Sequence, residues 1–318
     1  MTTQINDQQK NEANKETIIS QKNNRKVVTG FLSSSKGIEK IYYKRSLPIR
    51  KNPILLRVPH LIFLHDIGDY HGRYLAMGEK LIERFGDQII ISWLDVKGHG
   101  LSSGTRAHID DFEELINDFN NFLNLEISDF EPMNILIGQG LGALIGMRFF
   151  QEDFHSHIDL EGMILSGLPV KLNLELPDWV IKILKSIKSS ISHIRIPLKL
   201  DGFQLTHDIK LAKSYNSDPL IHQNIPISTI REVMNASSQI RTAGYFINIP
   251  TLFLVGEKDK LINTETVRLF YKGAPKEICD YKTYSNSGHD LFNDLDRDKI
   301  CDDLYTWIMR HFINKKEI

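Results

Sequence analysis

Two residues late in the chain, Asp259 and His289, have the types and the order of a carboxylic acid and a general base. Asp259 closes the segment Gly-Glu-Lys-Asp, and His289 closes Ser-Gly-His; each segment follows a short apolar run. A histidine that is oriented by a carboxylate can take a proton from a nucleophile or from water. In isolation, a histidine after a late glycine is usually a surface or capping residue, so these two residues gain weight only from the other motifs of the chain.

A glycine-rich turn at 138–142, Gly-Gln-Gly-Leu-Gly, follows the apolar run 133–137 and precedes a helical pattern. Two kinds of site use such a turn. One is the dinucleotide motif G-x-G-x-x-G/A, and the other is the nucleophile elbow G-x-S-x-G of α/β-hydrolases. In the second motif, Gly140 stands where the serine belongs.

The context of the turn disfavours the dinucleotide motif. Such a site needs an acidic residue at the end of the next strand, but the run 162–165 ends in Leu-Ser-Gly. The turn also opens a late βαβ unit instead of the first one. The two cysteines, Cys279 and Cys301, have no metal-ligand spacing. We therefore expect neither a cofactor nor a metal.

Strand-like and helix-like segments alternate along the chain, which predicts the scaffold for these residues. Continuous apolar runs predict strands at 60–64, 88–94, 133–137, 162–165, 251–255 and 278–284. Helical periodicity predicts helices at 74–85, 112–125 and 297–312. Runs of this kind are typical of parallel strands that are buried on both faces. The pattern predicts an α/β class with a mostly parallel, doubly wound sheet.

The alternation breaks at about 169–248, where helices are predicted at 177–192 and 228–245. We interpret this block as an inserted helical cap over the carboxyl ends of the strands; helices that merely extend the core are the alternative. The apolar face of the first helix is expected to line a pocket mouth with Trp179, Ile183, Leu184 and Ile187. Its opposite face carries Lys182, Lys185 and Lys188. These lysines predict a solvated face, with peripheral membrane contact as the alternative.

Composition excludes several classes of protein. The 318 residues carry 39 Lys+Arg and 40 Asp+Glu, a net charge of −1 that argues against a nucleic-acid partner. Residues 1–26 hold nine Asn or Gln and no apolar run of the length that a signal peptide needs. We expect a disordered tail at 1–26, one domain at 27–318 and a cytoplasmic location.

Seven segments, in order along the chain, resemble the monoacylglycerol lipase and lysophospholipase-type branch of the α/β-hydrolases, a group with a serine aminopeptidase-like domain. They are His-Asp-Ile-Gly at 65–68, His-Gly-Arg-Tyr at 71–74, Gly-His-Gly-Leu-Ser at 98–102, the glycine turn at 138–142, Asn-Ser-Asp-Pro-Leu at 216–220, Gly-Glu-Lys-Asp at 256–259 and Ser-Gly-His at 287–289. The resemblance implies an α/β-hydrolase fold with an inserted helical cap.

The resemblance also implies roles for single residues. Asp259 falls on the catalytic acid of the family and His289 on its general base. The backbone N–H groups of Ile67 and Leu141 fall on the oxyanion hole. Gly140 replaces the nucleophilic serine. Asp66 replaces a glycine beside the oxyanion hole, where its charge is expected to repel an oxyanion.

The replacements at residues 66 and 140 leave three hypotheses for the function. In the first, the protein has lost serine-based hydrolysis, as a pseudoenzyme does, and binds a lipid-like or acyl ligand or a protein partner. In the second, it is an ester hydrolase or lyase in which Asp259 and His289 activate water or another nucleophile. In the third, the serine of an ordinary esterase has been removed by mutagenesis, for which alanine is the usual replacement. We favour the first.

Overall fold

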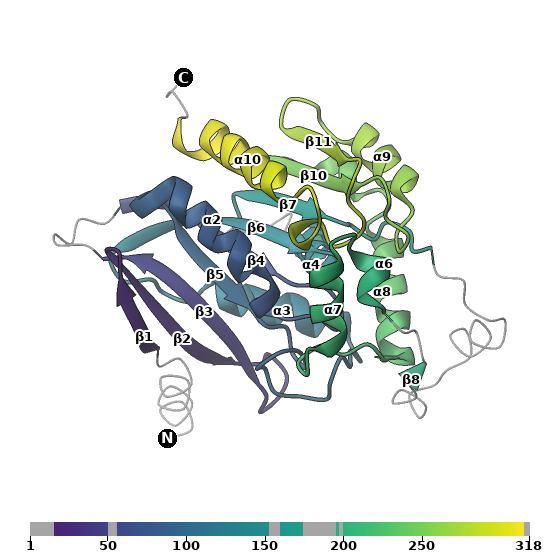
Figure 1. Ribbon diagram of the computed structural model, residues 1–318, viewed down its shortest axis with the longest axis horizontal. Coiled ribbons are helices and arrows are strands. Elements are labelled where there is room, and N and C mark those ends of the chain that lie inside the picture. The colour runs from purple at the N-terminus through teal and green to yellow at the C-terminus, as the bar shows by residue number, and fades with distance from the viewer. Residues whose placement is uncertain (1–15, 50–55, 153–159, 174–194, 197–199, 315–318) are drawn as a thin grey trace.

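A twisted nine-stranded sheet forms the centre of the computed structural model, which describes residues 16–49, 56–152, 160–173, 195–196 and 200–314 (Figure 1). The strand order is β1-β2-β3-β5-β4-β6-β7-β10-β11. The strands are β1 (Thr17–Lys22), β2 (Arg25–Ser33), β3 (Lys40–Pro48), β4 (Leu56–Leu64), β5 (Ile90–Leu94), β6 (Phe130–Gln139), β7 (Gly162–Ser166), β10 (Thr251–Gly256) and β11 (Cys279–Tyr284).

The strands from β5 to β11 pair in parallel, whereas β1, β2 and β3 pair antiparallel and join the sheet at β5. The prediction of a mostly parallel α/β sheet is therefore confirmed. Every predicted strand is present, with β4 and β6 longer at their N-terminal ends than predicted.

The N-terminal strands correct the predicted tail. We expected disorder to residue 26, but β1 covers Thr17–Lys22 and β2 begins at Arg25. Most side chains of β1 are exposed, so the strand depends on its backbone pairing with β2 and not on burial. An apolar pattern therefore could not reveal it. Residues 1–15 lie outside the described part of the chain.

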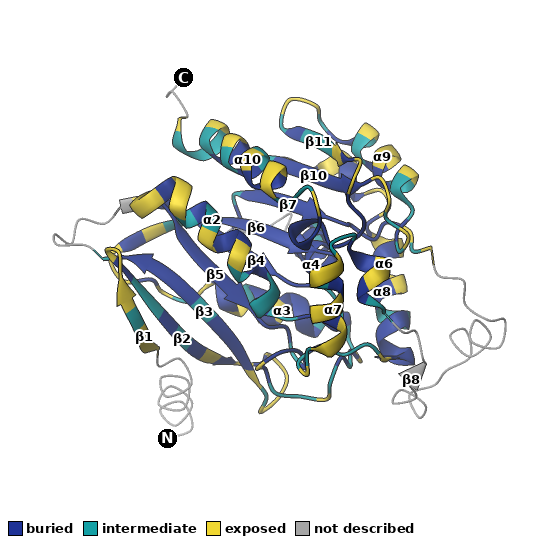
Figure 2. Cartoon of the chain, viewed as in Figure 1, coloured by how far each residue is buried: buried dark blue, intermediate teal, exposed yellow. Residues whose placement is uncertain are grey.

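Two separate cores cover the two faces of the sheet. Along β4, the side chains of Leu61 and Phe63 pack into one core, and those of Ile62 and Leu64 pack into the other. This alternation follows from the two-residue period of a strand. Both faces are apolar, which is why the run reads as continuous, and the inner strands β5, β4, β6, β7 and β10 are buried along most of their length (Figure 2).

Helices complete both cores. The first core contains residues of α2 (Leu75–Phe85) and α10 (Arg297–Ile308). The second contains residues of α3 (Phe112–Leu123), α4 (Leu141–Glu152), α8 (Ile227–Gln239) and α9 (Thr264–Gly273). The predicted helix at 228–245 is interrupted, because α8 ends at Gln239 and a short 3₁₀ turn follows at Ala243–Phe246.

The segment predicted as a cap is described in part. It contains β8 (Arg195–Ile196), α6 (Gly202–Leu205), α7 (Ile209–Ser217) and β9 (Ile225–Pro226), with β8 and β9 paired antiparallel. The helix predicted at 177–192 lies outside the described residues, and so do Trp179, Ile183, Leu184, Ile187 and the three lysines beside them. The cap boundaries remain a prediction. Within the described ranges, no helix has the length and apolar character needed to cross a membrane.

Candidate active site

Four predicted site residues meet at one edge of the sheet because each follows the carboxyl end of a parallel strand. Asp66 follows β4, Gly140 follows β6, Asp259 follows β10 and His289 follows β11. These strands are neighbours or near neighbours in the sheet. The topology therefore brings residues that are more than two hundred positions apart to one edge of the sheet. This is the edge where α/β proteins bind ligands.

Asp259 and His289 form the predicted pair. The Nδ1 atom of His289 lies 2.7 Å from Oδ2 of Asp259, and both side chains are almost fully buried. The other oxygen of Asp259 accepts the backbone N–H groups of Leu261 at 2.8 Å and Ile262 at 3.2 Å. This carboxylate is therefore fixed on both sides, and it fixes the orientation of the imidazole.

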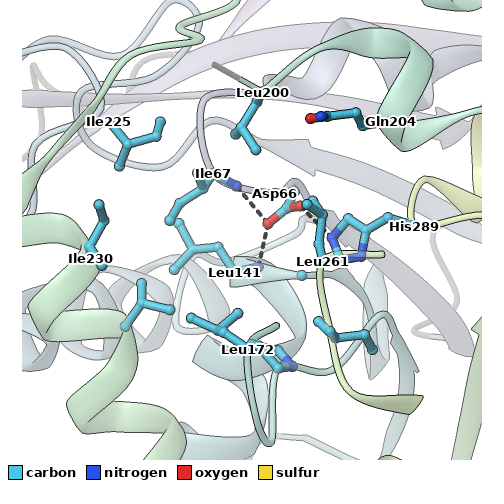
Figure 3. Close-up of a pocket in the computed structure, with 14 residues that line it drawn as sticks. Asp66, Ile67, Leu141, Leu172, Leu200, Gln204, Ile225, Ile230, Leu261 and His289 are labelled. Atoms are coloured by element: carbon cyan, nitrogen blue, oxygen red, sulfur yellow. Dashed lines mark hydrogen bonds and ion pairs between the residues drawn. The ribbon is translucent and has the colours of Figure 1, made fainter. Parts of the chain in front are cut away.

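The side chain of Asp66 joins the backbone N–H groups of the predicted oxyanion hole to the imidazole of His289, a contact that the sequence did not predict (Figure 3). Its Oδ1 accepts the backbone N–H groups of Ile67 at 2.7 Å and Leu141 at 2.8 Å. Its Oδ2 lies 2.9 Å from Nε2 of His289. The two N–H groups that were predicted to form an oxyanion hole thus bind a carboxylate of the chain itself.

Because Gly140 has no side chain, there is room beside it for the carboxylate of Asp66. Gly140 lies at the turn between β6 and α4 with a φ of +50°, a conformation that glycine adopts without steric cost. A Cβ atom built on Gly140 would lie 2.0 Å from Oδ1 and 2.2 Å from Cγ of Asp66. A side chain at residue 140 and the observed position of Asp66 therefore exclude each other.

The charges of the cluster stabilise one another. Burial alone would lower the pKa of His289, but the carboxylates of Asp259 and then Asp66 raise this pKa well above its usual value. Burial alone would raise the pKa of Asp66, but His289 and the N–H groups of Leu141 and Ile67 bring it below its usual value. The contact therefore favours the imidazolium form of His289 and the ionised form of Asp66.

Neighbouring side chains that sequence reasoning missed support the loop of His289. The amide of Gln139 donates a hydrogen bond to the carbonyl oxygen of His289 at 2.7 Å, and the hydroxyl of Ser166 donates to Gln139 at 2.6 Å. The next residue, Asp290, pairs with the buried guanidinium of Arg73. Arg73 belongs to the His-Gly-Arg-Tyr motif, which is the only signal in the sequence that marks it.

An apolar cavity of about 150 Å³ opens beside Asp66 and His289. Figure 3 shows side chains from several elements pointing into it around the carboxylate of Asp66. Its lining residues are Asp66, Ile67, Gly140, Leu141, Pro169, Leu172, Leu200, Gln204, Ile225, Ile230, Val233, Leu261, Ile262 and His289. The described residues contain no cluster of His, Cys, Asp or Glu that would suit a metal ion.

Comparisons with known proteins show the family and the fold of the chain. The family model described as serine aminopeptidase, S33 matches residues 58–296. The chain is 26% identical over 261 residues to the monoacylglycerol lipase of Mycolicibacterium smegmatis, covering 79% of this chain and 88% of the relative. It is 27% identical over 257 residues to the monoglyceride lipase of Rattus norvegicus, covering 78% and 82%.

Solved structures share the same arrangement of strands and helices. The monoacylglycerol lipase of Paleococcus ferrophilus superposes with a TM-score of 0.71 at 21% identity, over 85% of this chain and 99% of that one. A soluble variant of the Saccharomyces cerevisiae monoglyceride lipase, in complex with a substrate analog, gives 0.72 at 18% identity, over 88% and 94%.

Proposed function

The chain belongs to the serine aminopeptidase, S33 family and has the α/β-hydrolase fold, and from this premise we propose that it binds an uncharged, lipid-like ligand without hydrolysing esters through a serine. One observation carries the proposal: the carboxylate of Asp66 binds the N–H groups of Ile67 and Leu141 and the imidazole of His289 at the floor of an apolar pocket.

Serine-based hydrolysis needs a hydroxyl that attacks the ester and N–H groups that bind the resulting oxyanion. We infer that Gly140 stands at the nucleophile position, where it offers no atom for the acyl bond. Loss of the serine nucleophile costs about 10⁶ in turnover. Removing one oxyanion donor costs roughly 10²–10³. Here both donors are already engaged by Asp66, so hydrolysis is impaired at two steps.

The carboxylate of Asp66 also limits the chemical class of ligand that we expect the pocket to bind. A fatty acid released by such a site would place one carboxylate oxygen in the oxyanion hole and the other against the histidine. The side chain of Asp66 already makes these contacts. A free fatty acid anion would therefore meet a negative charge at the position that it needs. An uncharged amphiphile with a hydroxyl group can donate a hydrogen bond to Asp66 while its chain fills the apolar pocket.

The second candidate function is an ester hydrolase in which Asp259 and His289 activate water directly. In the structure, Nε2 of His289 contacts Asp66 at 2.9 Å, so this nitrogen is not available to water while the ionised carboxylate of Asp66 accepts its hydrogen bond. The tetrahedral oxyanion would also need the N–H groups that Asp66 engages. The geometry therefore favours ligand binding.

Ligand binding is tested by thermal denaturation and calorimetry with 1-O-octylglycerol, an ether that cannot be hydrolysed, and with octanoate. We expect the ether to raise the melting temperature, because a ligand at a hundredfold excess over its Kd stabilises by about 2.7 kcal/mol. Octanoate should bind at least tenfold more weakly at neutral pH. Equal affinity for the two compounds would contradict the role of Asp66 in selection.

A pair of variants on α8 locates the binding site. Ile230 lines the cavity and is buried, whereas Met234 lies one turn further on the same helix and is 44% exposed. Ile230→Trp should fill the cavity and abolish the shift with the ether, and Met234→Trp should leave it unchanged. If neither compound binds the wild-type protein, a protein partner becomes the better hypothesis.

Absence of serine chemistry is tested with a fluorophosphonate probe and p-nitrophenyl butyrate. We expect no labelled serine and an ester turnover equal to that of His289→Ala. Stoichiometric labelling of a serine, accompanied by turnover that depends on His289, would show that a serine mechanism operates.

A further inference from the structure

The environment of Asp66 resembles that of an ester group held for hydrolysis. Two backbone N–H groups bind Oδ1 at 2.7 and 2.8 Å, as an oxyanion hole binds the carbonyl oxygen of a covalent intermediate. Oδ2 lies 2.9 Å from the imidazole of His289. The side chain remains 21% exposed and lines the apolar cavity. Oδ1 is therefore fixed by two backbone N–H groups and Oδ2 by the imidazole of His289, in a side chain that borders the ligand site.

We propose that Asp66 is a nucleophile that attacks the saturated ring carbon of an apolar epoxide through Oδ2, forming an ester that the His289–Asp259 pair then hydrolyses. Carboxylate side chains form covalent intermediates of this kind in other enzymes. The inference goes beyond the proposed function but uses the same pocket for the apolar part of the substrate.

In the first step, a bond forms between Oδ2 and a ring carbon, and the bond between this carbon and the ring oxygen breaks. The bonding electrons pass to the ring oxygen, which takes the proton from Nε2 of His289. The product is a hydroxyalkyl ester of Asp66 next to a neutral imidazole. The starting charges suit this step, because the contact between the two side chains favours an ionised Asp66 and a protonated His289.

In the second step, neutral His289 takes a proton from water, and the water oxygen attacks Cγ of Asp66. The negative charge moves to Oδ1, where the N–H groups of Ile67 and Leu141 stabilise it. The bond between Cγ and Oδ2 then breaks, and the departing alkoxide takes the second proton of that water. The products are a diol, an ionised Asp66 and a protonated His289, so one water is consumed for each epoxide.

An epoxide suits this site better than a carboxylic ester does. Attack of Asp66 on an ester would create an oxyanion on the substrate, and that oxyanion would need the N–H groups that hold Oδ1. Opening of an epoxide places the developing negative charge on the ring oxygen, which is neutralised by the proton of His289 and does not need the two N–H groups. The leaving oxygen also stays attached to the substrate.

An isotope experiment tests the mechanism. Excess full-length protein is mixed with 1,2-epoxyoctane in H₂¹⁸O, and the diol and the peptide containing Asp66 are analysed by mass spectrometry. Because water attacks Cγ, we expect ¹⁸O in the carboxylate of Asp66 and none in the diol of the first turnover. Label in the diol alone would mean that water attacks the epoxide directly, which would overturn the proposal.

Variants supply a second readout. His289→Gln lacks the base for the second step, so a covalent adduct of 128 mass units (about the mass of 1,2-epoxyoctane) should accumulate on Asp66 whenever the ring opens without the imidazole proton. Asp66→Asn keeps an oxygen for the two N–H groups, but it should lose both diol formation and labelling. Asp298→Asn, an exposed carboxylate on α10, should behave as the wild type does.

Binding of 1-O-octylglycerol separates the two proposals. If the ether binds but wild-type protein yields neither diol nor ¹⁸O in Asp66, then the nucleophile role is rejected and ligand binding stands. If the ether also fails to bind, both proposals are rejected.

Discussion

Asp66 places a negative charge between two backbone N–H groups and an imidazole, and this charge helps to determine the protonation state of His289. The histidine lies between two carboxylates, with Asp259 at 2.7 Å from Nδ1 and Asp66 at 2.9 Å from Nε2. Each carboxylate favours the imidazolium over the neutral ring. At the scale of the residue, the two carboxylates therefore keep His289 protonated to a higher pH than a free histidine.

The variant Asp66→Asn should lower the pKa of His289, because it removes one of the two neighbouring negative charges while keeping an amide in the same place. We expect the imidazole signals of His289 in ¹H–¹⁵N spectra to titrate at a lower pH than in the wild type. At pH 7 the variant should also lose roughly 1.5–3 kcal/mol of unfolding free energy, the contribution of a hydrogen bond to a charged group.

The pH dependence of this loss has a definite sign. The stabilisation by Asp66 is present above its unfolded pKa of about 3.9 and is lost as the pH falls through its lowered folded pKa. The stabilisation by His289 is present below about 6.5 and is lost as the pH rises through its raised folded pKa. The difference between wild type and variant should therefore shrink at both extremes. Glu265→Gln, which alters an exposed pair with Arg268, should cost less than Asp66→Asn does at pH 7, because water screens the charges of an exposed pair.

At the scale of the element, the turn between β6 and α4 is coupled to the turn after β4. We expect Gly140→Ser to be destabilising and inactive on esters, because its Cβ would overlap the carboxylate of Asp66. Gly140→Ser with Asp66→Gly should be more stable than the single Gly140→Ser variant and should hydrolyse p-nitrophenyl butyrate at least tenfold faster. A double-mutant cycle by urea denaturation measures the coupling.

The outcome separates two explanations of the site. If the stability effects of the two substitutions add and the double variant has no activity, then residues 66 and 140 do not compete for space. The carboxylate of Asp66 would then not lie beside Gly140. His289→Ala in the double variant should remove any gained activity.

Arg73 connects the short helix at His71–Tyr74 to the loop that carries His289. Its guanidinium is buried, pairs with Asp290 and Asp69, and lies over the ring of Tyr215 at 4.8 Å. Removing one partner from a buried ion pair costs about 3–5 kcal/mol. Arg73→Met should therefore lower the unfolding free energy by about that amount, as measured in urea.

The matched control is Arg84→Met on α2, where the exposed arginine pairs with Asp302. This change should cost less than about 1 kcal/mol. Equal losses in the two variants would mean that the Arg73 cluster contributes no more than a surface pair does.

At the scale of the whole molecule, buried neutral histidines set the stability in acid. Burial lowers the pKa values of His60 and His99 to about 3. Their stabilisation is present above the unfolded pKa of about 6.5 and is lost as the pH falls toward the folded value. We expect the unfolding free energy to fall by up to about 1.4 kcal/mol per pH unit for each such histidine below pH 6.

His60→Gln isolates one of these contributions. His60 lies in β4 between Asn134 and Ser92, with hydrogen-bond distances of 2.8 and 2.7 Å. The variant should reduce the slope of stability against pH between about 6 and 4, whatever its stability at pH 7.5. Parallel profiles for variant and wild type, measured by urea denaturation, would contradict the role of His60.

The sequence predicted the parts of the fold whose side chains are buried on both faces. Strands such as β4 and β7 carry continuous apolar runs, because each face of the sheet meets its own core. By contrast, β1 is exposed, so its side chains carry little information about its pairing. The family resemblance also predicted that Asp66, Gly140, Asp259 and His289 would meet. The rotamer of Asp66 could not be predicted, because it depends on the volume that Gly140 leaves.

The overlap between a Cβ at residue 140 and the carboxylate of Asp66 has a consequence for how such sites diverge. The resemblance implies glycine then serine at these two positions in the family, whereas this chain has aspartate then glycine. Serine and aspartate together would place two side chains in one volume. We therefore expect an alignment of relatives to contain either pair, or glycine at both positions, but not both side chains at once.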